Sequence, residues 1–105
     1  MPLTIAEAKE LFGGASPAPD CALEVGQCYL IRTVTHYYTG RLALITPGEF
    51  VLDDAAWIAD TGQFSDSLKD GTLNEVEPYP GRCVVFRGAC VDAVVWPHAL
   101  PRTKK

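Results

Sequence analysis

The sequence has no long apolar run and no excess of positive charge. Its longest uncharged apolar stretches are far shorter than the ~20 residues that a membrane-spanning helix needs. The first residues, Met-Pro-Leu-Thr-Ile-Ala-Glu, hold no cationic region followed by an apolar run, so we expect no signal peptide. The chain has nine Lys and Arg residues and thirteen Asp and Glu residues, which gives a net charge of −4. This balance argues against broad nucleic-acid binding, which depends on neutralising phosphates. We therefore expect a cytoplasmic protein with no membrane partner.

The motifs of several enzyme classes are also missing. There is no phosphate-binding glycine loop, no Gly-x-Ser-x-Gly and no His-Glu-x-x-His. A thiol nucleophile needs a base beside it, yet Cys28 and His36 are eight residues apart (36 − 28), as are Cys90 and His98 (98 − 90). On one extended strand that spacing is roughly 26 Å, so neither pair meets unless the chain folds back. We expect no enzyme activity, and a small thiol or zinc enzyme is the weakest alternative.

The composition indicates one folded domain. The chain has 105 residues, of which 48% are hydrophobic and 21% charged, as in globular proteins with a single core. We divide residues 1–105 into an N-terminal helix at 4–13, a barrel at 26–97 and a tail at 98–105. Thr4 and Glu7 form a capping box, and the apolar residues behind them share one helical face. The basic tail is expected to be disordered.

Short β-like segments separated by turn signals fill the middle of the chain. We expect strands at about 28–35, 38–45, 49–59 and 73–77, and one helical turn at 65–71 that ends at Gly71. Gly40, inside the second strand, indicates a bend or bulge. Residues 82–96 then form two apolar strands joined by a tight turn at Arg87 and Gly88, where Gly88 is expected to take a positive φ. The pattern predicts a mainly β fold, with a short N-terminal helix and a bent five-stranded antiparallel barrel.

The two closing strands do not alternate between apolar and polar residues, so both of their faces need cover. Because the chain is short, a second copy of it can cover the face that the chain's own core does not. We therefore expect a homo-oligomer, most simply a closed ring. The residues expected at the interface are Val84, Phe86, Val91, Ala93, Val95 and Trp96.

Two segments resemble the Sm, LSm and Hfq-like barrels. Gly-Arg-Leu at residues 40–42, followed by Phe-Val-Leu-Asp-Asp-Ala at 50–55, is similar to the first Sm motif. Val-Phe-Arg-Gly-Ala-Cys-Val at 85–91 is similar to the second. The resemblance implies an Sm-like or SH3-like barrel, assembly into rings, and RNA or a nucleotide-like ligand bound through Arg87 and nearby aromatic residues.

The chain departs from that family at its uridine site. The Asp position of the site falls on Thr46, and the Asn position falls on Glu49 or Phe50. A carboxylate at Glu49 repels a phosphate backbone. The resemblance therefore favours the fold and the ring over RNA binding.

Two further stretches resemble uncharacterised small proteins of phages and bacteria. They are Arg-Thr-Val-Thr at residues 32–35 and Ala-Trp-Ile-Ala-Asp-Thr-Gly at 56–62. This likeness implies a phage or host protein as partner, and a location in the host cytoplasm or in a virion. Our main expectation is a non-enzymatic, ring-forming binding or structural module, and the alternative is an Sm-like ring that binds RNA or a nucleotide.

Aromatic residues near turns, combined with arginines, can stack on a base or nucleotide. The same aromatic residues are equally suited to core packing or subunit contacts. The candidate ligand-binding residues are Arg87, Gly88, Glu49, Tyr37, Tyr38, Arg41 and Trp57.

The cysteines show a repeated spacing. Cys21, Cys28 and His36 recur as Cys83, Cys90 and His98, an offset of 62 (83 − 21). Zinc selects thiolate and imidazole, but this spacing is wider than a Cys-x-x-Cys knuckle. Since Cys83 and Cys90 lie in apolar strands, we expect buried reduced thiols, no metal and no cofactor. A disulfide from Cys28 to Cys83 or Cys90 is the alternative in an oxidising compartment.

Asp53, Asp54 and Asp60 are the remaining candidates for a cation site. Neighbours on a strand point to opposite faces, so Asp53 and Asp54 do not converge. We expect a solvated strand edge and a turn cap instead.

Overall fold

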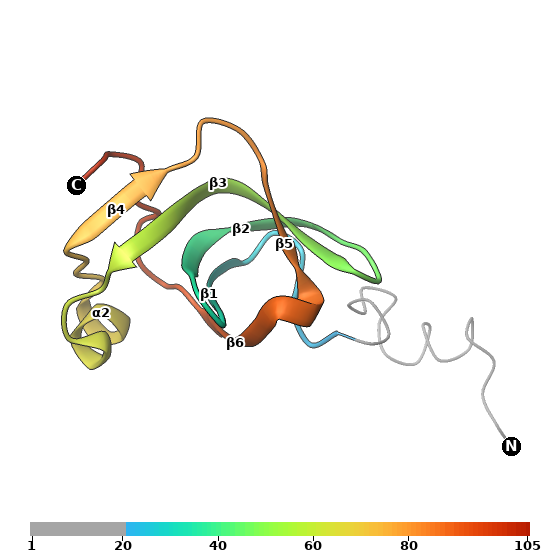
Figure 1. Ribbon diagram of the computed structural model, residues 1–105, viewed down its shortest axis with the longest axis horizontal. Helices are drawn as coiled ribbons and strands as arrows, with labels where there is room; N and C mark the ends of the chain where they lie inside the picture. The colour runs from blue at the N-terminus through green and yellow to red at the C-terminus, as the bar shows by residue number, and fades with distance from the viewer. Residues whose placement is uncertain (1–20) are drawn as a thin grey trace, which may run out of the picture.

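The computed structural model describes residues 21–105, so the helix expected at 4–13 lies outside the described residues. Six antiparallel strands form one sheet in this part of the chain (Figure 1). The strands are β1 (Cys28–Thr33), β2 (Tyr37–Ile45), β3 (Glu49–Asp60), β4 (Glu75–Pro78), β5 (Cys83–Phe86) and β6 (Cys90–Val95). Helix α2 (Phe64–Asp70) lies between β3 and β4, and the 3-10 turn η1 (Arg87–Ala89) joins β5 to β6. The prediction of a mainly β fold is confirmed. No helix within residues 21–105 is long and apolar enough to cross a membrane.

Strand β3 is the longest, and it arches across the molecule beside β2 (Figure 1). The sheet order is β4-β3-β2-β1-β6, and β5 also pairs with β3. The first part of β3, from Glu49 to Leu52, pairs with β5, whereas the part from Ala56 to Asp60 pairs with β4. The six strands correspond to the six β segments expected from the sequence, and residues 79–82 separate β4 from β5, which both pair with β3. Strands β5 and β6 end the curled path β6-β1-β2-β3-β5, and η1 connects these two ends.

Gly40 of β2 and Asp54 of β3 permit these two paired strands to bend. The register between β2 and β3 shifts across Gly40, as the sequence predicts. A Cβ atom on Gly40 would lie 3.0 Å from the Cβ of Leu52 and 3.3 Å from the Cβ of Ala55, an approach that leaves little room for a side chain. On β3, Asp54 has a φ of 50°, in the left-handed region that Asp tolerates better than most residues. The bend therefore depends on residues in the middle of both strands.

Strand β1 buries side chains on both of its faces. Tyr29 and Ile31 point into the curled sheet, whereas Leu30 points to the other face. Phe64 of α2 and Leu100 of the tail pack on that second face. The inner cluster comprises Tyr29, Ile31, Leu42, Phe50, Leu52, Ala55 and Val85, and the outer cluster comprises Leu30, Ala56, Ile58, Leu73, Val76 and Trp96. The chain thus covers both sides of β1 by itself.

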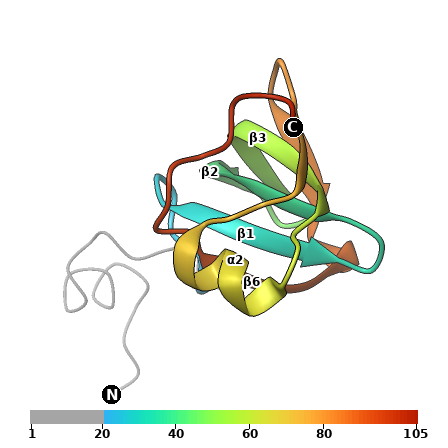
Figure 2. The same ribbon diagram turned by 90° about the vertical axis from the view of Figure 1, so that its left-hand side faces the viewer.

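The tail is held by hydrogen bonds, and the expectation of a disordered tail is wrong. His98 Nε2 lies 2.9 Å from the carbonyl oxygen of Leu68, one of the last carbonyls of α2, which have no partner within the helix. Lys105 exchanges two backbone hydrogen bonds with Val76 of β4, at 2.9 and 3.2 Å. The tail therefore runs beside α2 and ends against β4 (Figure 2).

Strands β5 and β6 do not form the expected hairpin. Strand β5 pairs with β3 and β6 pairs with β1, because the intervening η1 turns the chain away from a two-residue hairpin loop. Gly88 also lacks the expected positive φ. The glycines with positive φ in the described part of the chain are Gly26, Gly62 and Gly71.

Candidate functional site

The two closing strands leave apolar side chains in solvent. Val84 and Phe86 of β5 are exposed, as are Val91, Val94 and Val95 of β6. Phe86 keeps 64% of its surface accessible and Val91 keeps 61%. Within residues 21–105, β5 pairs only with β3 and β6 pairs only with β1. Two of the strands at which the described sheet ends, β5 and β6, thus carry exposed apolar side chains, a combination that favours association.

The exposed surface of β5 continues across the sheet. Val84 lies opposite Val51, and Val51 lies opposite Leu44, so these three side chains share the outer face. Leu44 is exposed and Val51 is buried between its neighbours. Glu49, opposite Phe86, places a carboxylate at the border of this surface. The apolar surface is therefore a patch across three strands.

The predicted interface residues are only partly available to a second copy. Ala93 is half-buried, because it lies opposite Ile31 and packs against the inner cluster. Trp96 is 2% exposed, belongs to the outer cluster, and donates its indole N–H to the Ala99 carbonyl oxygen at 3.3 Å. Its prediction as an interface residue is wrong, since its own chain covers it. The exposed members of the predicted set are Val84, Phe86, Val91 and Val95.

The predicted ligand residues do not form one site. Arg87 lies at the turn between β2 and β3, where its Nη1 donates to the Thr46 carbonyl oxygen at 2.8 Å. Its guanidinium carbon lies 5.2 Å from the centroid of the Phe50 ring. Glu49, in the same turn, accepts a hydrogen bond from Thr46 Oγ1 at 3.2 Å. Gly88 follows in η1, so these three predicted residues lie at the start of β3.

Tyr38 and Trp57 lie opposite each other near the other end of β3. The His36 ring stacks on Tyr38 with 6.0 Å between centroids and 18° between planes, and it lies 5.7 Å from Trp57. Tyr38 stacks in turn on Tyr79 at 6.3 Å. Burial raises the pKa of Tyr79 to about 12 and also raises the pKa of Tyr38. We call His36, Tyr38, Tyr79 and Trp57 the aromatic row.

The prediction missed His36 as a member of the aromatic row. The signal was the strand period of two, which places residues 36 and 38 on the same face. The same period places Tyr37 on the opposite face. There the guanidinium carbon of Arg32 lies 5.7 Å from the Tyr37 ring centroid and 5.0 Å from that of Phe64. The cation over these two rings is thus Arg32, one of the arginines that can combine with aromatic residues to bind a base.

Arg32 is also ion-paired with Asp92. Its Nε donates to Asp92 Oδ1 at 2.7 Å, and its Nη2 contacts Oδ2 of the same carboxylate. The hydrogen bonds from Arg32 hold the pKa of Asp92 below its usual range. This ion pair links the neighbouring strands β1 and β6, in which Arg32 lies opposite Asp92.

Two hollows flank Tyr37. The first, of about 320 Å³, is lined by Arg32, Thr33, Val34, Tyr37 and Val91. The second, of about 300 Å³, lies on the other side of Tyr37 and is lined by Thr35, Trp57 and residues 58–61. The first hollow includes Val91 of β6, so it is continuous with the exposed apolar surface of that strand.

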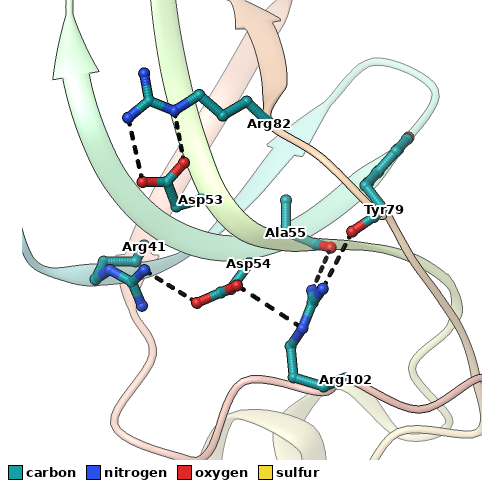
Figure 3. Close-up of polar contacts among 7 residues, drawn as sticks. All are labelled: Arg41, Asp53, Asp54, Ala55, Tyr79, Arg82 and Arg102. Atoms are coloured by element: carbon teal, nitrogen blue, oxygen red, sulfur yellow. Dashed lines mark hydrogen bonds and ion pairs between the residues drawn. The ribbon is translucent and has the colours of Figure 1, made fainter.

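Arg41, another predicted ligand residue, belongs to an ion-pair network on the bend of β3 (Figure 3). Its Nη2 lies 3.0 Å from Asp54 Oδ2. The neighbouring Asp53 accepts a hydrogen bond from Arg82 Nε at 2.8 Å. The two carboxylates therefore bind separate arginines, in agreement with the expectation that they do not converge.

The same network fastens the tail. Arg102 donates to the carbonyl oxygens of Ala55 at 2.9 Å and Tyr79 at 3.1 Å, and its Nε lies 4.0 Å from Asp54 Oδ1 (Figure 3). Residues 53–55 fall between the parts of β3 that pair with β5 and β4. Arg102 of the tail thus donates a hydrogen bond to the Ala55 carbonyl oxygen, which lies between the two paired parts of β3.

The cysteines lie on both sides of β1. Cys28 packs against the outer cluster, whereas Cys83 and Cys90 pack against the inner one. This separation contradicts a disulfide from Cys28 to either of them. Burial raises the pKa of the Cys83 and Cys90 thiols, which favours their protonated form.

No group of three or more His, Cys, Asp or Glu side chains within residues 21–105 is placed to hold a metal ion. Asp60, considered above as a cation ligand, accepts a hydrogen bond from the Gly62 N–H at 2.8 Å and therefore caps a turn, as expected.

Comparison of the chain with protein-family models, curated proteins and solved structures gives no match.

Proposed function

We propose that this chain is a non-enzymatic homo-oligomeric module, with a binding or structural role, that assembles through β5 and β6. The observation that carries the proposal is the pair of strand edges that bear the exposed Val84, Phe86, Val91 and Val95. Unpaired strand edges with apolar side chains lead to uncontrolled aggregation unless something covers them. A second copy of the chain provides matched cover for both edges.

A ring is the simplest closed form of this assembly. Contact of β5 in one copy with β6 in the next, made head-to-tail, closes into a ring when the rotation permits. The sequence resemblance to Sm-like barrels supports the ring. The resemblance to small phage proteins supports a phage or prophage role, with a phage or host protein as the further partner.

The test is the mass of the particle in solution, measured by size-exclusion chromatography with light scattering and by native mass spectrometry. We expect a multiple of the 11.4 kDa chain at micromolar concentration. Val84→Lys should lower the mass towards one chain, because it places a charge on the outer face of β5. Val25→Lys is the matched control, since Val25 is an exposed valine in the turn before β1. A wild-type protein that stays monomeric would remove the proposal.

We propose as a second candidate that the aromatic row stacks on a planar, nucleotide-like ligand, including a base of RNA. The near-parallel rings of His36, Tyr38 and Tyr79 support it. Tryptophan fluorescence during titration with nucleotides and oligouridine at low salt tests the idea. Tyr38→Ala should weaken binding, whereas Arg87→Ala should leave it unchanged, since Arg87 lies at the other end of β3. No binding to any of these ligands would reject this candidate.

A further inference from the structure

Phe86 is an aromatic side chain that projects from the end of β5. It keeps 64% of its surface exposed, although phenyl groups are normally buried. Its strand neighbour Val85 is 4% exposed and belongs to the inner cluster, so the alternation of the strand turns Phe86 outward. The ring therefore extends from a rigid, paired strand.

The hollow beside Tyr37 is a recess on the same molecule with both apolar and polar walls. Val34 and Val91 line it from two sides, and both are largely exposed, at 81% and 61%. Tyr37 and Arg32 complete its wall. A cavity of about 150 Å³ holds a benzene ring, so a hollow of about 320 Å³ has room for a phenyl group. Phe86 is not among the residues that line it.

We propose that the Phe86 ring of one copy inserts into the hollow formed by Arg32, Val34, Tyr37 and Val91 of the next copy. This inference rests on the proposed self-association and names the contact that drives it. The insertion buries the phenyl ring together with the two exposed valines that border the recess. It also brings the β5 edge of one copy towards the start of β6 in the next.

The charges of the hollow suit an aromatic guest. The Arg32 guanidinium already lies over the faces of Tyr37 and Phe64, at 5.7 and 5.0 Å from their centroids. Its pairing with Asp92 keeps it in place at the wall of the recess. A third aromatic ring entering the hollow meets this cation, and such contacts become stronger when water is excluded.

The inserted ring and the hollow are different surfaces, so every copy offers one of each. When it is made head-to-tail, this contact propagates from copy to copy until a ring closes. A copy that lacks only the ring still has a hollow, and a copy that lacks only the hollow still has a ring. Two such copies join once and then stop.

The experiment uses this complementation in the full-length chain. Phe86→Glu removes the ring, and Val34→Glu places a carboxylate in the hollow. Each variant alone should lose about tenfold or more in apparent association constant, as expected for an aromatic anchor. An equimolar mixture of the two should form a 1:1 dimer and nothing larger. Val25→Glu, at an exposed valine in the turn before β1 that does not line the hollow, should assemble like the wild type.

Circular dichroism and thermal unfolding verify that the variants fold. Phe86→Ala and Val91→Glu replace any variant that does not. If the wild type is monomeric, both this inference and the proposed function are rejected. If the wild type assembles and both variants assemble equally well, the insertion is rejected while self-association stands. If each variant is monomeric and the mixture is too, the ring does not meet this hollow, and the inference is again rejected.

Discussion

Replacement of Gly71 by alanine should destabilise the protein through two separate effects. Gly71 ends α2 with φ 77° and ψ 15°, and its N–H donates to the Ser67 carbonyl oxygen at 2.9 Å, which confirms the helix end predicted at this glycine. An alanine held in this left-handed conformation costs roughly 1–2 kcal/mol. The new Cβ atom would also lie 2.6 Å from Cγ and 2.8 Å from Cβ of His98, so the imidazole has to move.

The second effect adds to the first. Moving the His98 ring breaks its 2.9 Å contact with the Leu68 carbonyl oxygen, which contributes about 1 kcal/mol. It also disturbs the edge-to-face packing on Trp96, where the ring centroids are 4.9 Å apart. We expect a loss of about 2–4 kcal/mol, a large share of the 5–15 kcal/mol typical of a domain. The corresponding fall in Tm is roughly 10–30 °C.

Urea denaturation followed by tryptophan fluorescence measures the loss. Gly88→Ala is the matched control, because Gly88 has no positive φ and no atom of the described structure lies within 4 Å of the added Cβ. The control should change stability by less than about 1 kcal/mol. In a His98→Ala background, the cost of Gly71→Ala should fall to the backbone part alone. Equal costs at Gly71 and Gly88, or a cost at Gly71 that does not depend on His98, would refute the reasoning.

Three further predictions concern the tail and two ionisable groups. Arg102→Ala should lower the free energy of unfolding by about 1–2 kcal/mol, because two carbonyl groups lose a charged donor; urea denaturation that matches the wild type would contradict the tail's role. Arg32 lowers the pKa of Asp92. The stabilisation of the fold by the Asp92 carboxylate is therefore complete above the unfolded-state pKa and disappears as the pH falls through the folded-state pKa. The stability difference between the wild type and Asp92→Asn should therefore shrink in acid, and a difference constant with pH would contradict this. The pKa of Tyr79 is raised to about 12, so its contribution is present below the unfolded-state pKa and is lost as the pH rises through the folded-state value. Phenolate absorbance should show late-ionising tyrosine absorbance that is smaller in Tyr79→Phe, whereas the same titration in both proteins would contradict the assignment.

The extents of the first strands were predictable because their signals are local. The observed β1, β2 and β3 end within two residues of the predicted strands at 28–35, 38–45 and 49–59. β-branched and aromatic residues define these segments, and turn residues separate them. The bulge at Gly40 and the helix end at Gly71 were also readable, because each depends on what the backbone of one glycine permits.

The partners of the closing strands were not predictable from local pattern. Two apolar segments around a glycine resemble a hairpin whether they pair with each other or with β1 and β3. The difference arises from the three residues of η1 and from partners far away in the sequence. Trp96 was assigned to an interface for a related reason, since nothing in its neighbourhood shows that the tail packs over it.

Some residues of the candidate sites were recognisable from the local sequence, and others were not. Exposed members of the interface, such as Phe86 and Val91, were recognised from the excess of apolar residues in the closing strands. The ligand residues were of suitable chemical types but came from different places, and the alternation of strand faces already separates Tyr37 from Tyr38. The hollow beside Tyr37 was not foreseeable, since its walls come from β1, β2 and β6.

The sequence by itself determined a mainly β chain, its first three strand segments, the bend at Gly40 and the surplus of apolar side chains near the end. Only the tertiary structure decided which of those side chains are covered by the chain's own tail and which remain in solvent. The physical reason is that strand propensity and turn chemistry act between neighbours, whereas burial depends on contacts between residues far apart along the chain.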